Sequence, residues 1–432
     1  MINHTTTKTT TVVTASIAAA PARTLPFVIA WIVCTAFYFL EYAIRAAPAV
    51  MIPELANNFG VSALGVSGII GTYYYTYSTT SLVAGVLLDQ FGAKFVIPAG
   101  IVVLACGCAL FAIPSPIAGD IGRLMQGAGS AFAFTGAVYL AAHGLSAQRL
   151  ATAIGVTQCV GMLGGSAGQL AVGPLVHGRI TAPEFWYLIG TLVFMVALIL
   201  VTITPSEPRA RNVTSVASSV LTPYKVVFSN PQSYLCGLVA GLLFAPTTVL
   251  DMVWEVRFLE QDSSFSYGSA VFAASMVPFG WVIGCPLLGW VADMLGRRKP
   301  ALICGELIML ICILQLTFVP APPYTWATLL VFGIGSGAAM IPYTIIKEVN
   351  PDRVKGSATG AMNFLTFSVT AGIGPIFANV YGKTLATTTD HAAHLHQTRL
   401  FWISIIVLAS IISALLKETG SAARSTAGLA EP

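Results

Sequence analysis

The stretch from Phe27 to Ile52 is long and apolar, yet it contains an acid and a base, Glu41 and Arg45. A helix that spans a bilayer needs about 20 mostly apolar residues, and an ionised side chain at its centre costs about 2.5–3.5 kcal/mol. The two residues are four positions apart with the acid first, so they share a helix face and can pair. The pair either lines a solute pathway or is an interhelical pair that only fixes packing.

The chemistry expected of a pathway differs for the two side chains. Arg45 would attract a carboxylate or another anionic group of a solute, and Glu41 would carry a coupling proton. Binding of the anion to Arg45 would compete with Glu41, which is a physical route to coupling. Asp251 is a second candidate proton carrier, because it lies about 7.5 Å past the middle of its apolar stretch at the helical rise.

Four uncharged side chains are candidate solute ligands. Tyr73 and Tyr77 share a helix face and can present hydroxyl groups to a cavity, although aromatic residues are also common packing elements. Gln158 and Asn363 can bind carbonyl or carboxylate groups, with interhelical hydrogen bonding as the alternative role.

The composition predicts a polytopic membrane protein. Hydrophobic residues make up 56% of the chain and charged residues 9%, whereas soluble domains carry roughly 25% charged residues. The net charge of +4 does not indicate nucleic-acid binding, because the basic residues are spread among short loops. The sequence contains no nucleotide-binding loop, catalytic triad or metal-ligand spacing, so we expect no enzymatic activity, no cofactor and no metal.

Apolar runs separated by polar breaks predict twelve membrane-spanning helices. The expected spans are residues 27–52, 64–88, 94–113, 118–143, 150–176, 185–204, 232–259, 267–292, 300–319, 325–347, 357–381 and 399–416. We therefore expect an N-terminal bundle over residues 25–204, a cytoplasmic linker over 205–231 and a C-terminal bundle over 232–418. The remaining residues, 1–24 and 419–432, are expected to be cytoplasmic tails.

The two halves repeat each other in sequence. GVLLDQFG at 85–92 matches GWVADMLG at 289–296, and ATAIG at 151–155 matches GSATG at 356–360. Gln158 and Asn363 occupy matching positions in this repeat. The duplication predicts two pseudo-symmetric six-helix bundles, with a solute site between them near the middle of the membrane. Most Lys and Arg residues fall on one side, which places both termini in the cytoplasm under the inner membrane.

The loops after the second and eighth spans resemble a signature of the major facilitator superfamily. The matching residues are Gly85, Asp89 and Gly92 in the first loop, and Gly289, Asp293, Gly296, Arg297 and Arg298 in the second. Arg123 to Gly129, which opens the fourth span, is similar to another motif of this family. The resemblance implies an all-α fold of two bundles in which the loop residues gate the conformational change. A purely structural turn is the alternative role for these loops.

Two further stretches narrow the resemblance. FYFLEYAIRAAPAVM and IIKEVNPDRVKGSATGAMNF resemble a branch with bacterial phagosomal-type nutrient carriers and lysosomal dipeptide carriers. Lys347, in the second stretch, falls at a helix end, where we expect a latch rather than a solute ligand.

The sequence thus predicts a monomeric secondary active transporter that works by alternating access. Its expected solute is small and polar or anionic, such as an amino acid, a short peptide or an organic acid, and it is imported with a proton. Two alternatives stay open: an efflux carrier for drugs or metabolites, and a non-transporting membrane sensor on the same fold.

Overall fold

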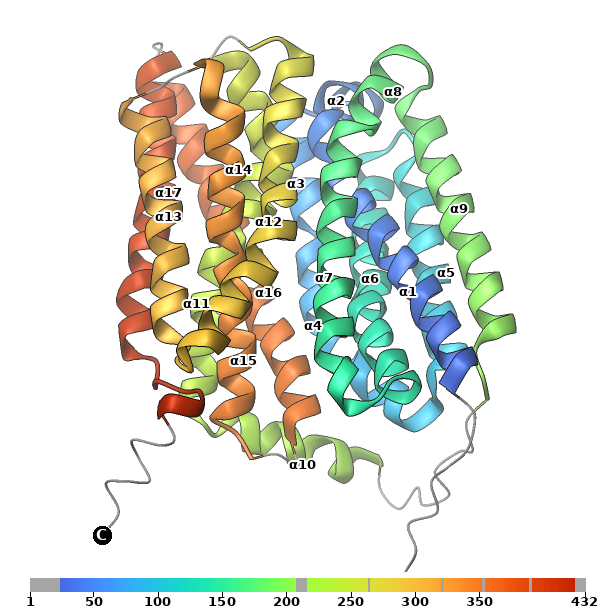
Figure 1. Ribbon diagram of the computed structural model, residues 1–432. Coiled ribbons are helices and arrows are strands. Elements are labelled where there is room, and N and C mark those ends of the chain that lie inside the picture. The colour runs from blue at the N-terminus through green and yellow to red at the C-terminus, as the bar shows by residue number, and fades with distance from the viewer. Residues whose placement is uncertain are drawn as a thin grey trace, which may run out of the picture.

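The computed structural model describes residues 24–206, 216–262, 265–319, 322–351, 354–387 and 391–423. Most of these residues are helical, and no strand occurs among them. The long helices stand side by side, with α10 (Val216–Phe228) lying across one end of the molecule (Figure 1). We call this the α10 end, and we call the opposite end, which carries α2 (Ile52–Phe59), the α2 end. The predicted N-terminal tail lies almost wholly outside the described residues.

The N-terminal half forms one group of helices, which we call the N group. Besides α2, its members are α1 (Thr24–Ala46), α3 (Ala63–Gly71), α4 (Tyr73–Phe91), α5 (Ala93–Phe111), α6 (Pro116–Gly144), α7 (Ala147–Leu170), α8 (Val172–Gly178) and α9 (Ala182–Ile203). A short 3-10 turn, Ala47–Val50, joins α1 to α2.

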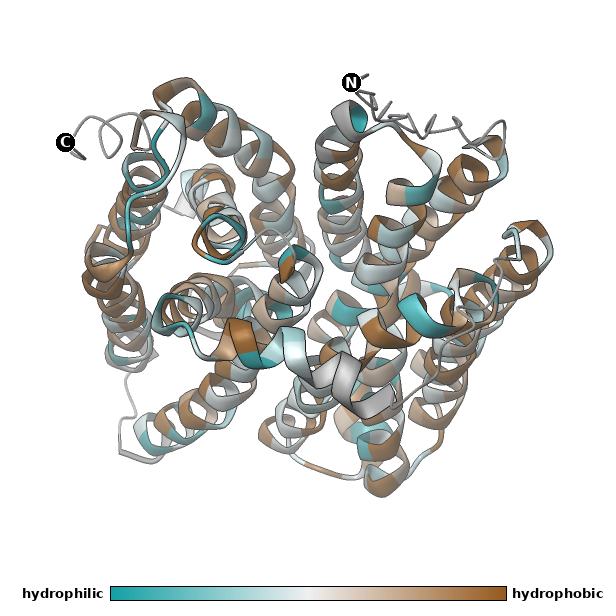
Figure 2. Ribbon diagram, turned by 90° about the horizontal axis from the view of Figure 1, so that it is seen from below, coloured by the Kyte–Doolittle hydropathy of each residue, from teal (hydrophilic) through white to brown (hydrophobic). Residues whose placement is uncertain are grey.

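The C-terminal half forms the second group, the C group. Its members are α11 (Pro231–Ala245), α12 (Tyr267–Leu295), α13 (Lys299–Phe318), α14 (Thr325–Ser336), α15 (Ile341–Glu348), α16 (Lys355–Thr387) and α17 (His391–Leu415). Seen from the α10 end, the two groups lie side by side and α10 crosses between them (Figure 2). The Tyr224 hydroxyl of α10 donates to the Leu82 carbonyl of α4 at 2.9 Å, so this helix ties the linker to the N group.

Ten of the described helices are long and apolar enough to cross a membrane. The expected second and fourth spans are not among them. The reason is composition, since α4 carries the polar run TYSTTS and α6 contains many glycines together with Arg123 and Gln126. Both polar side chains of α6 are fully buried, and α6 packs against α1, α4 and α5. The chain is an all-α polytopic membrane protein, as predicted.

Several predicted spans are interrupted helices, among them the second, the seventh and the tenth. The second span divides at Thr72 into α3 and α4. The seventh continues beyond α11 as a π-helix, Pro246–Glu255. Proline has no backbone N–H to donate, and π-helical turns are frequent at functional sites. The change of helix type begins at Pro246.

Glycines bring helices into direct backbone contact in both groups. A Cβ placed on Gly164 of α7 would lie 2.1 Å from the Phe39 carbonyl oxygen of α1. In the C group, a Cβ on Gly333 of α14 would lie 2.1 Å from the Val277 carbonyl oxygen of α12. Such small-residue contacts hold helices together in membranes, where no hydrophobic driving force acts between helices.

Candidate functional site

The charged pair of α1 is buried between the two groups. Glu41 and Arg45 have exposed fractions of 0% and 1%. Arg45 donates to Glu41 Oε1 from Nη2 at 2.5 Å and from Nε at 3.1 Å. The Tyr73 hydroxyl also donates to Oε1. Glu41 Oε2 and Arg45 Nη1 are buried without a hydrogen-bond partner, so each side of the pair has one unused polar atom.

Aromatic rings surround the Arg45 guanidinium. Its Cζ lies 4.2 Å from the ring centroid of Tyr42 and 4.7 Å from that of Tyr77. Tyr73 is at 5.2 Å and Phe367 at 5.6 Å. Rings at these distances stabilise a cation through their negative faces. Phe367 belongs to α16, so the C group completes an enclosure that otherwise comes from the N group.

A small central cavity of about 10 Å³ lies beyond these rings, with room for about one water molecule. Tyr42, Tyr77 and Phe367 form part of its wall, and Gln158 and Asn363 complete it. Arg45 does not reach this cavity, because the rings lie between them. In this conformation the predicted anion site is therefore one layer of side chains away from open space.

The two predicted amide ligands make equivalent hydrogen bonds in the two halves. The Tyr38 hydroxyl of α1 donates to Gln158 Oε1 at 3.1 Å. The Tyr343 hydroxyl of α15 donates to Asn363 Oδ1 at 2.9 Å. The Gln158 Nε2 donor remains buried without a partner. The structure thus brings both amides to the same central cavity, as the repeat predicted.

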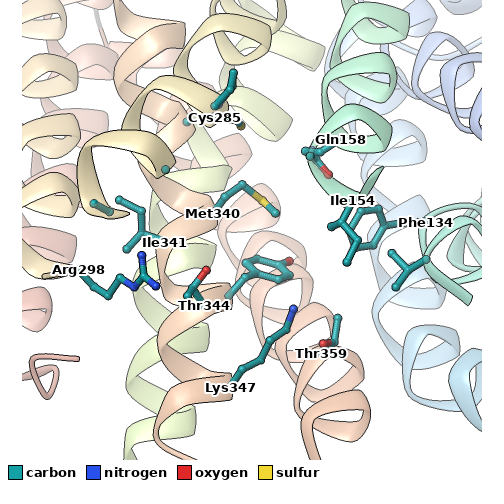
Figure 3. Close-up of a pocket in the computed structure, with 17 residues that line it drawn as sticks. Phe134, Ile154, Gln158, Cys285, Arg298, Met340, Ile341, Thr344, Lys347 and Thr359 are labelled. Atoms are coloured by element: carbon teal, nitrogen blue, oxygen red, sulfur yellow. The ribbon is translucent and has the colours of Figure 1, made fainter. Parts of the chain in front are cut away.

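A larger cavity of about 260 Å³ continues from this point toward the α10 end. Its walls come from α6 and α7 on one side and from α12, α15 and α16 on the other (Figure 3). The two cavities share four wall residues, Phe134, Gln158, Met340 and Tyr343. Both charged residues that line the larger cavity are basic, Arg298 and Lys347.

Asp251 lies apart from the Glu41–Arg45 pair. It is 2% exposed and sits in the π-helix, where Gln169 Nε2 of α7 donates to its Oδ2 at 3.3 Å. Its Oδ1 is buried without a partner. Neither of the two cavities described above includes Asp251 in its wall. The second predicted proton carrier therefore lies in the contact between the groups rather than beside the first.

The glycines of the loop motif take two kinds of position. Gly92 and Gly296 have φ angles of 75° and 62°, which residues with a Cβ rarely adopt. A Cβ on Gly85 or Gly289 would meet nothing within 4 Å. Gly289 lines the 260 Å³ cavity, so empty space adjoins it in this conformation.

The charged loop residues differ between the two copies of the motif. Arg298 pairs with Asp293, and its Nη2 lies 2.9 Å from Glu348 Oε1. Arg297 is exposed. Asp89 is exposed beside a neighbouring cavity and makes no ion pair with the residues that the structure describes. A charged cluster of the expected kind is therefore formed only by the second copy in the described part of the chain.

Hydrogen bonds close the contact between the groups toward the α2 end. The Tyr267 hydroxyl of α12 donates to the Val50 carbonyl at 2.7 Å, and the Tyr74 hydroxyl of α4 donates to the Thr248 carbonyl at 3.2 Å. Ser166 of α7 donates to the Ser275 carbonyl of α12 at 2.9 Å. The groups are thus hydrogen-bonded to each other toward the α2 end, and a further cavity of about 280 Å³ lies between α3 and α4 on one side and the π-helix and α16 on the other.

Sequence reasoning missed three tyrosines and a phenylalanine at the site. Tyr38, Tyr42 and Arg45 recur at helical spacing along α1, and this signal could have identified both rings. Tyr343 and Phe367 come from distant segments with no such signal. Lys347, expected to be a latch, lines the larger cavity.

These features define a membrane protein with a central, polar and enclosed site between two helix groups. Comparison with known proteins gives the class. The profile of the Major Facilitator Superfamily matches residues 34–375. The chain belongs to this family, so it has the fold of secondary transporters and is not an enzyme, and the resemblance of its loop motifs is confirmed.

Individual relatives are distant. A "Probable hexose phosphate transport protein" of Chlamydia pneumoniae is 22% identical over 425 residues, which cover 89% of this chain and 88% of that protein. The "Membrane sensor protein UhpC" of Escherichia coli K12 is 22% identical, with 89% of each chain covered. A "D-galactonate transporter" of E. coli O6:H1 is 26% identical over 202 residues, but the match covers 45% of this chain and 44% of that transporter.

Solved structures show the same fold. A bacterial homologue of the human lysosomal transporter Spinster, in an inward-facing and unoccupied conformation, superposes with a TM-score of 0.70. The two are 16% identical, over 90% of this chain and 97% of the homologue. A point mutant of the nucleoside transporter NupG gives a TM-score of 0.69 at 13% identity, over 90% of this chain and 99% of the transporter.

Proposed function

We propose that this chain imports a small organic anion together with a proton across the inner membrane. The observation that carries the proposal is the Arg45 guanidinium, which is buried among aromatic rings with its Nη1 unused. Guanidinium groups present a planar fork of donors that suits carboxylate and phosphate groups. The names of two relatives, a D-galactonate transporter and a hexose phosphate transport protein, refer to anionic solutes and support this class.

Competition for Arg45 supplies the coupling. Without solute, Glu41 neutralises Arg45 through two hydrogen bonds. A proton on Glu41, for which the unpartnered Oε2 is the free position, removes the charge of the acid and leaves the guanidinium uncompensated. A solute anion then replaces Glu41 as the partner of Arg45. Loss of the proton restores the original pair and releases the solute.

Alternating access requires the cavity to close toward the α10 end. We assign this end and both termini to the cytoplasm by the positive-inside rule, and on that assignment the conformation is inward-facing. Gly85 and Gly289 adjoin empty space here, and this supports a role for them where the two groups approach each other. Breakage of the Tyr267–Val50 hydrogen bond would accompany opening toward the outside. Asp251, in the same contact, is the second proton carrier.

Transport by purified protein in liposomes tests the proposal. We expect D-galactonate or glucose 6-phosphate to accumulate against its gradient when the outside is acidic, whereas uncharged galactose does not. Glu41→Gln abolishes this accumulation but spares exchange of solute for solute, because the amide binds no proton at neutral pH. Glu306→Gln is the matched control, since Glu306 is a buried acid of α13 that bonds Ser413 away from the cavities. Normal pH-driven accumulation by Glu41→Gln would rule out the coupling role.

A second function is favoured by one comparison. The sensor UhpC matches nearly the whole chain, so a receptor that binds the same anion without moving it is the alternative. Wild-type protein that binds the anion in detergent but supports neither accumulation nor exchange in liposomes would establish the sensor and exclude the carrier.

A further inference from the structure

Lys347 extends into the 260 Å³ cavity from the last turn of α15, beside Thr359 (Figure 3). It makes no ion pair or side-chain hydrogen bond with the residues that the structure describes. A latch needs a partner across the gap, and none is present among these residues. A cation that lines a cavity without a partner is instead available to a ligand.

Among the described residues that line the cavity, Lys347 is the cation whose charge no ion pair compensates. Arg298 also lines the wall, but Asp293 and Glu348 compensate its charge. No acidic side chain lines this cavity among the described residues. On the opposite group, Asp89 lines a neighbouring cavity and not this one. A concave site with low-dielectric walls and one sign of charge concentrates ions of the opposite sign.

A continuous series of side chains connects Lys347 to the buried pair. Tyr343 lies one helical turn before Lys347 and lines both cavities. The central cavity is lined in turn by Tyr42 and Tyr77, whose rings stack on Arg45. An anion that leaves Arg45 toward the α10 end therefore meets Lys347 as the next uncompensated cation.

We propose that Lys347, with the hydroxyl of Thr344, forms a second anion-binding subsite at the α10 end of the cavity. It binds the carboxylate or phosphate group of an organic anion on its way between Arg45 and the aqueous phase. The subsite rests on the proposed function for its solute, but its charge can be measured without one.

The substitution Ile154→Cys, on the opposite wall of the cavity, provides a reporter of the charge of Lys347 (Figure 3). The rate at which this cysteine reacts with an anionic, sulfonate-bearing methanethiosulfonate is compared with its rate for a cationic, trimethylammonium-bearing one. Protein that lacks this cysteine gives the background rate. A charge about 6 Å from the reagent in water changes the ratio of the two rates by about tenfold, so Lys347→Gln should lower the anionic preference by up to about that factor. Lys347→Arg should preserve it, and so should Lys417→Gln, an exposed lysine of the same end.

Two results of the cysteine experiment would overturn the subsite. One is an unchanged ratio in Lys347→Gln. The other is an equal change in both rates, which would show that Lys347 acts on opening of the cavity, as a latch does, rather than on anions.

Solute binding provides the second arm. Lys347→Gln should weaken binding of D-galactonate and glucose 6-phosphate by about tenfold, equal to about 1.4 kcal/mol, and should leave binding of galactose unchanged. Wild-type affinity for these anions retained in Lys347→Gln would refute the subsite alone. Wild-type protein that binds no organic anion would refute the proposed function instead, and the cysteine ratio would still decide whether Lys347 attracts anions.

Discussion

Removal of one member of the Glu41–Arg45 pair should cost far more stability than removal of both. In Arg45→Met the acid, which is 0% exposed in the wild type, keeps the Tyr73 hydroxyl as its one donor among the residues that the structure describes. Breaking a buried ion pair in this way typically costs about 3–5 kcal/mol, because a charge is left uncompensated. In Arg45→Met combined with Glu41→Gln no charge remains, and the cost falls to about 1–2 kcal/mol for the lost hydrogen bonds.

The double-mutant cycle therefore predicts a coupling free energy of at least about 2 kcal/mol between the two positions. The free energy of unfolding is measured in mixed detergent micelles for the wild type, both single variants and the double variant. Arg45→Met combined with Glu306→Gln is the control, because Glu306 shares no partner with Arg45, so its effects should add. Coupling below about 0.5 kcal/mol at the first pair would show that the two charges are not a mutually dependent unit.

Two further predictions concern the contacts between helices. Gly164→Ala should lower the free energy of unfolding by about 2 kcal/mol or more, because its Cβ would meet the Phe39 backbone at 2.1 Å. Gly155→Ala is the control and should be neutral or stabilising, because a Cβ there meets nothing within 4 Å. Equal effects of the two substitutions would contradict the close packing at Gly164. Tyr267→Phe removes the 2.7 Å hydrogen bond to the Val50 carbonyl, which is worth about 1 kcal/mol. Distances between spin labels on α2 and α12 should therefore show about a fivefold larger population in which the groups are separated at the α2 end. An unchanged population would show that this bond does not hold the groups together.

The sequence was informative where the relevant contacts are local. Glu41 and Arg45 are one helical turn apart, so their pairing follows from helix geometry alone. The repeat placed Gln158 and Asn363 at equivalent positions, and each amide accepts a bond from a tyrosine of its own half. In these cases the residue spacing or the internal duplication was sufficient to predict which side chains lie near one another.

Contacts between distant segments could not be predicted in the same way. Phe367 covers Arg45 from the other helix group, and nothing in either segment indicates that they meet. Lys347 follows a 3-10 turn, Gly337–Met340, between α14 and α15. A change of helix type alters which face later residues present, so a continuous helix drawn from the sequence misplaces this side chain. The linker helix α10 was also missed, because it contains Pro223 and lies within the longest polar break of the sequence.

The hydrogen bonds between the two groups at the α2 end have a chemical asymmetry with a consequence for transport. In each of those described above, a side-chain hydroxyl donates to a main-chain carbonyl across the boundary. A carbonyl oxygen has two lone pairs, so the Thr248 and Ser275 carbonyls, which lie inside helices, keep their helical bonds when the foreign donor departs. The Val50 carbonyl and the released hydroxyls are solvated by water. Separation of the two groups at the α2 end therefore leaves no polar group without a hydrogen-bond partner. The closed and open conformations can then differ little in free energy, as a reversible transport cycle demands.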